Sequence, residues 1–190
     1  QKEAFESSKL YKRIGDLSQV VISLFCDDSG SGALGFGAEH PQNLGYIKDK
    51  RTLVYIDSPS RLTGFNTLKK AIELRDNFLG GWEKVVVLGW NFAYDISSAI
   101  NELNDSKLEV LVIPPDLLDK LKSKATYKKL VDSGKIRFSS LQYLVIKPIE
   151  KSIYNAELEE LNISLDNYIL LSPDNIPLDD SDKKALHNLM

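Results

Sequence analysis

A chain of 190 residues is long enough for one ordinary domain, or for a large domain with an appendage. Its composition, 43% hydrophobic and 27% charged with a formal net charge of −3, is that of a soluble globular protein. It excludes a strongly basic nucleic-acid binder as a whole, but not a local basic patch. No apolar run approaches the roughly 20 residues that span a bilayer, so we expect no membrane partner.

The few cysteine and histidine residues limit the chemistry further. A single cysteine, Cys26, excludes an internal disulfide and indicates a cytoplasmic location. His40 and His187 lie far apart in the sequence, and we therefore expect no metal site. The chain begins at Gln1 rather than at a methionine, which we interpret as a piece of a longer polypeptide.

Residues 1–50 predict an N-terminal helical segment and a glycine-rich connector. Apolar residues between Phe5 and Phe25 recur at mixed helical spacing. Five of the eleven glycines then fall between Gly30 and Gly45. Their spacing matches neither a dinucleotide-binding loop nor a P-loop, so we favour a flexible connector over a phosphate cradle.

Residues 51–150 predict an α/β domain. Apolar strands are expected at residues 53–57, 84–90, 108–113 and 136–149. Helices are expected at residues 67–79, where Gly80 and Gly81 follow, at residues 93–103, and in a long lysine-rich stretch that begins near Asp116. Strands that alternate with helices in units of this size indicate parallel crossovers.

Residues 151–190 have a different texture. They predict a β-hairpin with its turn near Asp166 and Asn167, followed by an acidic tail. The fold class expected for the whole chain is therefore α/β. It would hold a mainly parallel, three-layer, Rossmann-like sheet, with a helical segment before it and a β-hairpin after it.

A candidate pocket lies where two predicted strands end. Ligands of open α/β sheets bind at the carboxyl ends of the strands, which here carry Asp57, Ser58, Trp90 and Asn91. In a nucleotide site, Asp57 would accept from a ribose, Trp90 would stack on the base and Asn91 would hydrogen-bond. The alternative, which we favour, is that Asp57 and Asn91 cap the following helices while Trp90 packs against a helix.

A basic segment follows the last parallel strand and is a candidate for contact with DNA phosphates. It holds Lys120, Lys122, Lys124, Lys128, Lys129, Lys135 and Arg137. At helical spacing, Lys120, Lys124 and Lys128 share one side. The alternative is a solvated helix face, as in most lysine-rich helices.

Several stretches between Leu53 and Ile149 follow the pattern of a known family. They are VYIDSPSRLTG, TLKKAIELRDN, GGWEKVVVLGWNF, LEVLVIPPDLLDKLKSK and SGKIRFSSLQYLVIKP, and the later NYILLSPDNIPLDD is similar too. Together they cover rather more than half of the chain. They resemble the C-terminal, non-catalytic region of prokaryotic adenine-specific DNA methyltransferases of the type III modification-subunit kind.

The resemblance implies an accessory domain. Such enzymes carry an Asp-Pro-Pro-Tyr motif and a Phe-x-Gly-x-Gly loop, whereas this chain has only DSPS at Asp57 and IPPD at Ile113, so no catalytic residue is transferred. The parent enzyme would use S-adenosylmethionine as its cofactor, and we expect this chain itself to bind no cofactor. The implied partners are DNA, the catalytic methyltransferase domain of the same polypeptide and a restriction subunit. Two alternatives stay open: a protein-interaction module without DNA contact, and a small-ligand or nucleotide-binding Rossmann-like domain.

Overall fold

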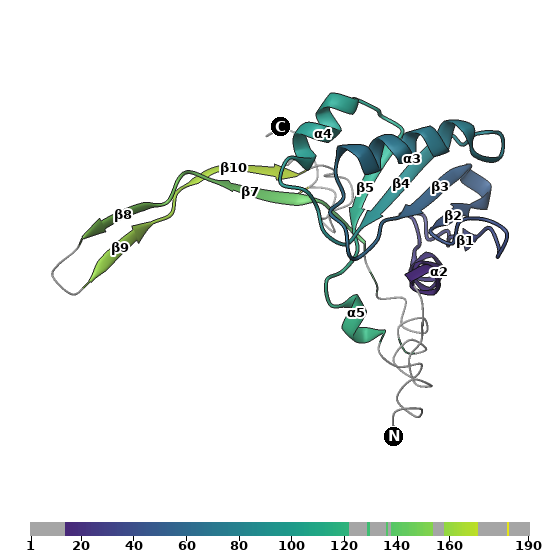
Figure 1. The fold of residues 1–190 in the computed structure, drawn as a ribbon, viewed down its shortest axis with the longest axis horizontal. Coiled ribbons are helices and arrows are strands. Elements are labelled where there is room, and N and C mark those ends of the chain that lie inside the picture. The colour runs from purple at the N-terminus through teal and green to yellow at the C-terminus, as the bar shows by residue number, and fades with distance from the viewer. Residues whose placement is uncertain are drawn as a thin grey trace, which may run out of the picture. The chain divides into compact units, whose positions relative to one another are not determined.

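The computed structural model describes residues 14–121, 129, 136, 138–153, 158–170 and 182. The chain divides into two compact units, residues 1–139 and residues 140–190. We describe each unit by itself (Figure 1).

The first unit is built on a six-stranded mixed sheet. Its strands lie in chain order: β1 (Leu34–Gly35), β2 (Leu44–Ile47), β3 (Thr52–Ile56), β4 (Lys84–Gly89), β5 (Leu108–Val112) and β6 (Ser139–Ser140). The pairs β1–β2 and β2–β3 are antiparallel, whereas β3–β4 and β4–β5 are parallel. The α/β class and the parallel centre are thus confirmed, and the sheet as a whole is mixed.

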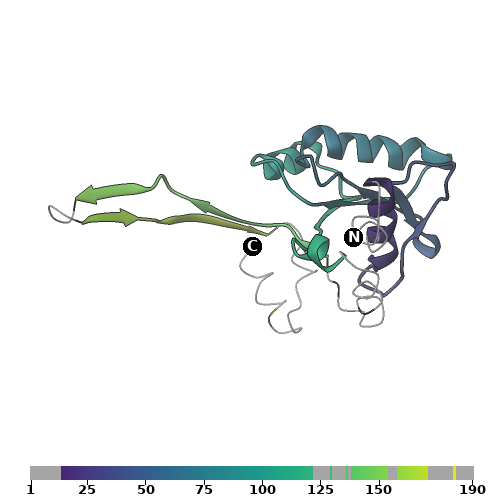
Figure 2. The same cartoon turned by 60° about the horizontal axis from the view of Figure 1, so that its bottom comes forward.

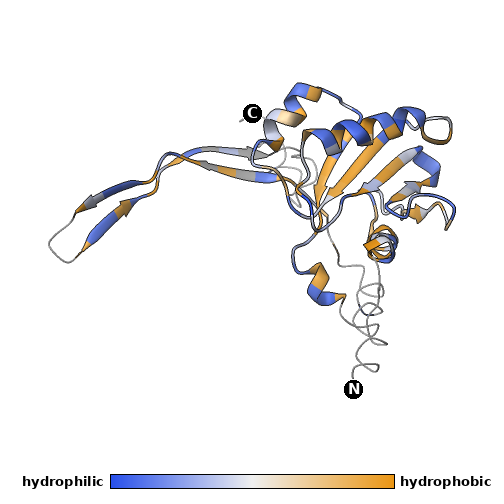
Figure 3. Ribbon diagram, viewed as in Figure 1, coloured by the Kyte–Doolittle hydropathy of each residue, from blue (hydrophilic) through white to orange (hydrophobic). Residues whose placement is uncertain are grey.

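The central strands are covered on both faces. All five residues of β3 are buried, and so are five of the six in β4. Because successive side chains of a strand point to opposite faces, Val86 and Leu88 join one core cluster while Val85 and Val87 face the other side. Figure 3 shows these strands as the most hydrophobic part of the sheet. Continuous apolar runs such as VVVL are typical of strands buried in this way.

Four α-helices are described in this unit. They are α2 (Ile14–Leu24), α3 (Phe65–Asn77), α4 (Ile96–Leu103) and the short α5 (Leu117–Lys120). Figure 2 shows α3 and α4 along one face of the sheet and α2 on the other. Two 3-10 turns, η1 (Lys48–Lys50) and η2 (Phe78–Gly80), precede β3 and follow α3. The helices predicted at residues 67–79 and 93–103 are confirmed. None of the helices described is both long and apolar enough to cross a membrane.

A buried charge fixes α3 to the loop before β5. Arg75 is 6% exposed, and its Nη1 donates to both carboxylate oxygens of Asp105 at 2.7 and 2.8 Å. Its Nε donates to Asp76 at 2.8 Å. The hydrogen bonds from Arg75 hold the pKa of Asp105 below its usual range, although partial burial acts in the opposite direction. The pairing allows a guanidinium to be buried in the helix face.

The glycine-rich segment contributes to the sheet rather than forming a connector throughout. It contains β1 and β2, and β2 pairs with β3 along its full length. A Cβ added at Gly45 would lie 2.8 Å from the Ile22 side chain of α2 and 2.9 Å from the carbonyl of Leu34. Gly45 therefore permits a close approach between α2 and the sheet, a role that spacing alone does not distinguish from flexibility.

The second unit contains a two-stranded antiparallel ribbon. Its outgoing strand holds β7 (Gln142–Ile146) and β8 (Glu150–Ile153), and its returning strand holds β9 (Glu159–Asn162) and β10 (Leu165–Leu170). We call residues 142–153 and 158–170 the ribbon. β7 pairs with β10, and β8 pairs with β9 (Figure 1).

The predicted turn near Asp166 and Asn167 is wrong. Asp166 and Asn167 lie within β10, and β9 and β10 follow one another along the same strand of the ribbon. The partner of β10 is β7, which the sequence assigned to the parallel sheet. The sequence correctly indicated strands here, but a local pattern carries no information about which strand pairs with which.

Candidate functional site

Asp57 follows β3 at the predicted pocket and is 4% exposed. One carboxylate oxygen accepts from the backbone N–H of Ser58 at 2.8 Å, and the other accepts from the hydroxyl of Thr63 at 2.7 Å. Thr63 is fully buried. Both oxygens of Asp57 thus hold the loop that connects β3 to α3.

Trp90 and Asn91 follow β4. The side chain of Trp90 belongs to the core cluster of the first unit and is 9% exposed. Asn91 is exposed, and its Nδ2 donates to the carbonyl of Pro59 at 3.3 Å. Its own carbonyl accepts from the N–H of Thr63 at 2.8 Å. The structure brings Asn91 to the loop that Asp57 organises and buries Trp90 in the core. The predicted helix caps are wrong, because the N-cap residues of α3 and α4 are Gly64 and Asp95, and neither helix has a side-chain cap.

Phe92 closes the end of β4. Phe92 and Thr63 form an isolated parallel bridge, and the ring of Phe92 occupies the space that a Cβ of Gly89 would need. The same Cβ would lie 2.9 Å from the hydroxyl of Thr63. Gly89 is therefore required by close packing at the carboxyl edge of the sheet. Whether any ligand binds at Asp57, Ser58, Trp90 and Asn91 stays a prediction.

The basic segment is described only in part. Lys120 is the last residue of α5 and forms an ion pair with Asp116, one helical turn earlier. Lys129 is exposed. Five of the predicted contacts lie outside the described residues: Lys122, Lys124, Lys128, Lys135 and Arg137. Phosphate binding by this segment stays a prediction.

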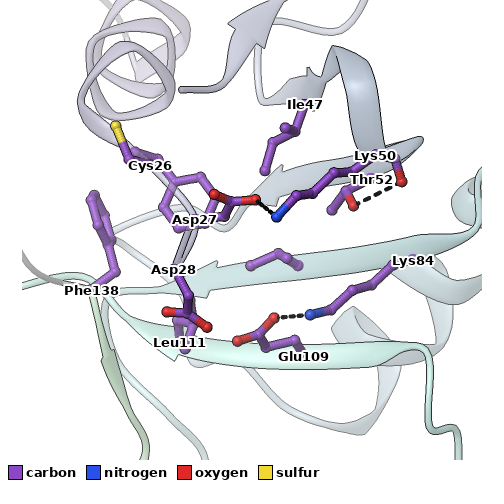
Figure 4. Close-up of a pocket in the computed structure, with 12 residues that line it drawn as sticks. Cys26, Asp27, Asp28, Ile47, Lys50, Thr52, Lys84, Glu109, Leu111 and Phe138 are labelled. Carbon is purple, nitrogen blue, oxygen red and sulfur yellow. Dashed lines mark hydrogen bonds and ion pairs between the residues drawn. The ribbon is translucent and has the colours of Figure 1, made fainter. Parts of the chain in front are cut away.

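A pocket that the sequence did not predict lies at the opposite, amino ends of the parallel strands. Its volume is about 120 Å³. It is lined by Thr52 and Lys84, the first residues of β3 and β4, and by Glu109, the second residue of β5. Phe25 and Phe138 line it as well, and their rings meet edge to face at 5.2 Å. Figure 4 shows two lysine side chains that reach toward two carboxylates across this pocket.

Two ion pairs lie in the pocket, whose lining also includes a third carboxylate, Asp28. Lys50 and Asp27 meet at 2.6 Å, and Lys84 pairs with Glu109 on the neighbouring strand. The second pair depends on strand register, because β4 and β5 place Val86 opposite Glu109 and so bring Lys84 close to it. No motif in the sequence marks residues that lie this far apart.

Asp27 is held ionised. Partial burial acts to raise the pKa of Asp27, but hydrogen bonds from Lys50, Ser29 and the Ser31 backbone outweigh it and bring the value to about 2. The carboxylate accepts from the N–H of Ser29 at 3.0 Å and from that of Ser31 at 2.9 Å. A group with so low a pKa is poorly suited to general acid–base catalysis near pH 7, so we assign Asp27 to the architecture of the loop after α2.

Comparison with protein-family models, with curated proteins and with solved structures finds no match to this chain. Within the described residues, no group of three or more His, Cys, Asp and Glu side chains is placed to hold a metal ion.

Proposed function

We propose that this chain is an accessory, non-catalytic domain of a cytoplasmic adenine-specific DNA methyltransferase of a restriction-modification system. In this proposal the first unit adopts a three-layer, Rossmann-like arrangement, and S-adenosylmethionine is bound by the catalytic domain of the same polypeptide. The family resemblance supports it, because the stretches that carry the resemblance include β3, α3, β4 and β5, which form the framework of the sheet.

The carboxyl ends of β3 and β4 support a non-catalytic role. Methylation of an adenine amino group requires an extruded base held in a pocket beside the methyl donor. Here both oxygens of Asp57 accept internal hydrogen bonds, and Phe92 packs against Gly89. The polar groups at this edge join two loops of the domain together.

The ribbon supports a role in contact between protein domains. Large apolar side chains lie exposed along it, from 45% exposure for Ile146 to 81% for Ile153. They are Leu144, Ile146, Ile149, Ile153, Leu158, Leu161, Ile163, Leu165 and Tyr168. An isolated two-stranded hairpin is marginally stable in water, and a run of exposed apolar side chains indicates a contact surface.

Strand register gathers apolar side chains on one face of the half of the ribbon that β7 and β10 form. Leu144 lies opposite Tyr168, and Ile146 lies opposite Leu165. Leu144 and Ile146 share a face because they are two residues apart. An irregularity between Leu165 and Asn167 leaves one residue over, which brings Leu165 to the face of Tyr168.

A second irregularity continues this face along the ribbon. Residues 147–149 lie opposite the two residues 163 and 164, so the outgoing strand has one residue over. Counting along both strands then places Ile153 and Leu161 on the same face as Ile146 and Leu165. We call these four residues, with Leu144 and Tyr168, the apolar face. In β8 and β9 the same face also carries Lys151 and Glu159, which lie opposite Leu161 and Ile153. In β8 and β9 the opposite face is polar and holds Glu150, Ser152, Glu160 and Asn162.

The charge of the ribbon favours a protein partner over DNA. Its described residues include four carboxylates, Glu150, Glu159, Glu160 and Asp166, against two lysines, Lys147 and Lys151. Lys151 is itself paired with Glu159 at 2.7 Å. A surface with excess negative charge is repelled by phosphates. We therefore propose that the apolar face docks on the catalytic methyltransferase domain of the same polypeptide.

Co-purification tests this docking. The full chain is co-expressed with the separately tagged region that precedes it in the parent reading frame, which we expect to carry an Asp-Pro-Pro-Tyr motif and a glycine loop. Leu144→Glu combined with Leu161→Glu is expected to lower the recovery of the chain at least tenfold, because two charges would be buried in the contact.

The matched control is Ser152→Glu combined with Asn162→Glu on the polar face, which adds the same charge and should leave recovery unchanged. Equal recovery of all variants contradicts the docking role. An upstream region without the two motifs contradicts the assignment to this enzyme class.

A further inference from the structure

A second groove in the first unit combines aromatic rings with positive charge. It lies between the end of β2 and the segment of residues 79–82 that follows α3, and its volume is about 320 Å³. That volume is in the range of small-ligand sites, roughly 300–1,000 Å³. Its lining is formed by Tyr46, Lys48, Arg51, Leu79, Gly81 and Trp82. None of these six lining residues belongs to the pocket or the basic segment that the sequence predicted.

The aromatic residues of the groove, Tyr46 and Trp82, are held in place by ring contacts and a hydrogen bond. The rings of Tyr46 and Trp82 lie 5.8 Å apart at an angle of 41°. Phe36 packs against both of them, with centroids at 4.8 Å from Tyr46 and 5.4 Å from Trp82. The indole N–H of Trp82 donates to the carbonyl of Phe78 at 2.9 Å. Trp82 is only partly buried, so a fixed indole borders the groove.

The groove carries two cations. Lys48 and Arg51 are both exposed. Arg51 donates from Nη2 to the carbonyl of Gly81 at 2.8 Å, and its Nε lies 4.0 Å from the carboxylate of Glu83. Glu83 is itself exposed, so this pairing is weak. The guanidinium of Arg51 is thus positioned by a backbone carbonyl, and its positive charge is only weakly paired within the protein.

The backbone around the groove is strained. Arg51 and Leu79 adopt left-handed conformations, with φ of 45° and 49°. They are two of the three non-glycine residues with positive φ in the described part of the chain, and Gly80 and Gly81 follow at 87° and 85°. Leu79 is also 57% exposed. Arg51 is the C-cap residue of η1, and Leu79 lies within η2 directly after α3, so these left-handed conformations fix the two turns that border the groove.

We propose that this groove binds a nucleotide. The base stacks on the partly buried rings of Trp82 and Tyr46 where they line the groove, and the phosphate is held by Lys48 and Arg51. Stacking on an aromatic side chain accepts any base, and a cation beside the ring recognises the phosphate attached to it. The nucleotide can be free in solution or part of single-stranded DNA. This inference is independent of the proposed docking of the ribbon.

Tryptophan fluorescence of the full chain distinguishes this site from others. The chain has two tryptophans, and the other, Trp90, lies in the core. The indole N–H of Trp90 has no hydrogen-bond partner among the residues that the structure describes, so Trp90→Phe breaks none there and leaves Trp82 as the single reporter. We expect saturable quenching when adenosine monophosphate or a ten-nucleotide oligodeoxyadenylate is added. Calorimetry on the unaltered chain should give the same affinities.

Variants of the groove decide the outcome. Trp82→Leu is expected to weaken binding at least tenfold by calorimetry. Lys48→Glu, an exposed change that preserves folding, should weaken it to a similar extent, whereas Lys69→Glu on the exposed side of α3 should leave it unchanged. Binding of both probes assigns the site to nucleotides in general, and binding of the oligonucleotide alone assigns it to single-stranded DNA. Absence of binding by both probes, or equal binding by the Lys48→Glu and Lys69→Glu variants, overturns the proposal.

Discussion

Single charged residues in this protein have their pKa set by local hydrogen bonds. Asp27 has the clearest shift, to about 2, with donors from Lys50, Ser29 and the backbone of Ser31. An aspartate whose pKa is lowered by folding stabilises the folded state above the pKa of the unfolded chain, about 3.9, and this stabilisation is lost as the pH falls toward the folded value.

The corresponding prediction concerns acid unfolding. Between about pH 4 and pH 2 the free energy of unfolding should fall because Asp27 takes up a proton on unfolding. Asp27→Asn should remove this part of the pH dependence and lower stability at pH 7, measured by urea denaturation at several pH values. Asp49→Asn, at an exposed position nearby, serves as the control. An identical pH dependence in the Asp27→Asn variant and the unaltered chain would contradict the assignment.

At the scale of elements, most strands and helices of the first unit follow from local pattern. The runs at β3, β4 and β5 are apolar throughout because both faces are covered, and α3 shows helical periodicity. The pairing of the ribbon strands could not be predicted from local pattern, because it joins residues that are far apart in sequence and two irregularities shift its register. Its strands were expected, but their partners were not.

The end of β4 gives a test of close packing between elements. Gly89→Ala should destabilise the protein by about 1–3 kcal/mol, because the new methyl group overlaps the ring of Phe92 and approaches the Thr63 hydroxyl at 2.9 Å. Gly32→Ala is the matched control, since its Cβ would meet only the Cys26 sulfur at 3.9 Å. Thermal and urea unfolding measure both. If Phe92→Ala fails to restore part of the stability of the Gly89→Ala variant, the explanation is incorrect.

For the whole molecule, charge distribution decides between possible partners. The net charge is −3, so any contact with DNA depends on local excess positive charge, which the segment from Lys120 to Arg137 provides in sequence. If this segment contacts DNA phosphates, the combined change of Lys120, Lys124 and Lys128 to Glu should abolish binding to duplex DNA in a gel-shift titration. Binding of the unaltered chain should be insensitive to sequence and should weaken steeply with salt. Unchanged binding by the variant would reject the phosphate role.

The sequence alone determined that the chain forms an α/β body. Strands buried on both faces appear as continuous apolar runs and amphipathic helices as apolar residues at helical spacing, and both patterns are local in the sequence. It also singled out Asp57, Trp90 and Asn91 as residues of the strand ends, although Asp57 and Asn91 hold loops there and do not cap the following helices as predicted. Only the tertiary structure decided which distant residues meet. The balanced charges of Lys84 and Glu109, the apolar face of the ribbon and the aromatic groove at Trp82 arise from strand register and turn geometry, and neither is encoded in a local spacing.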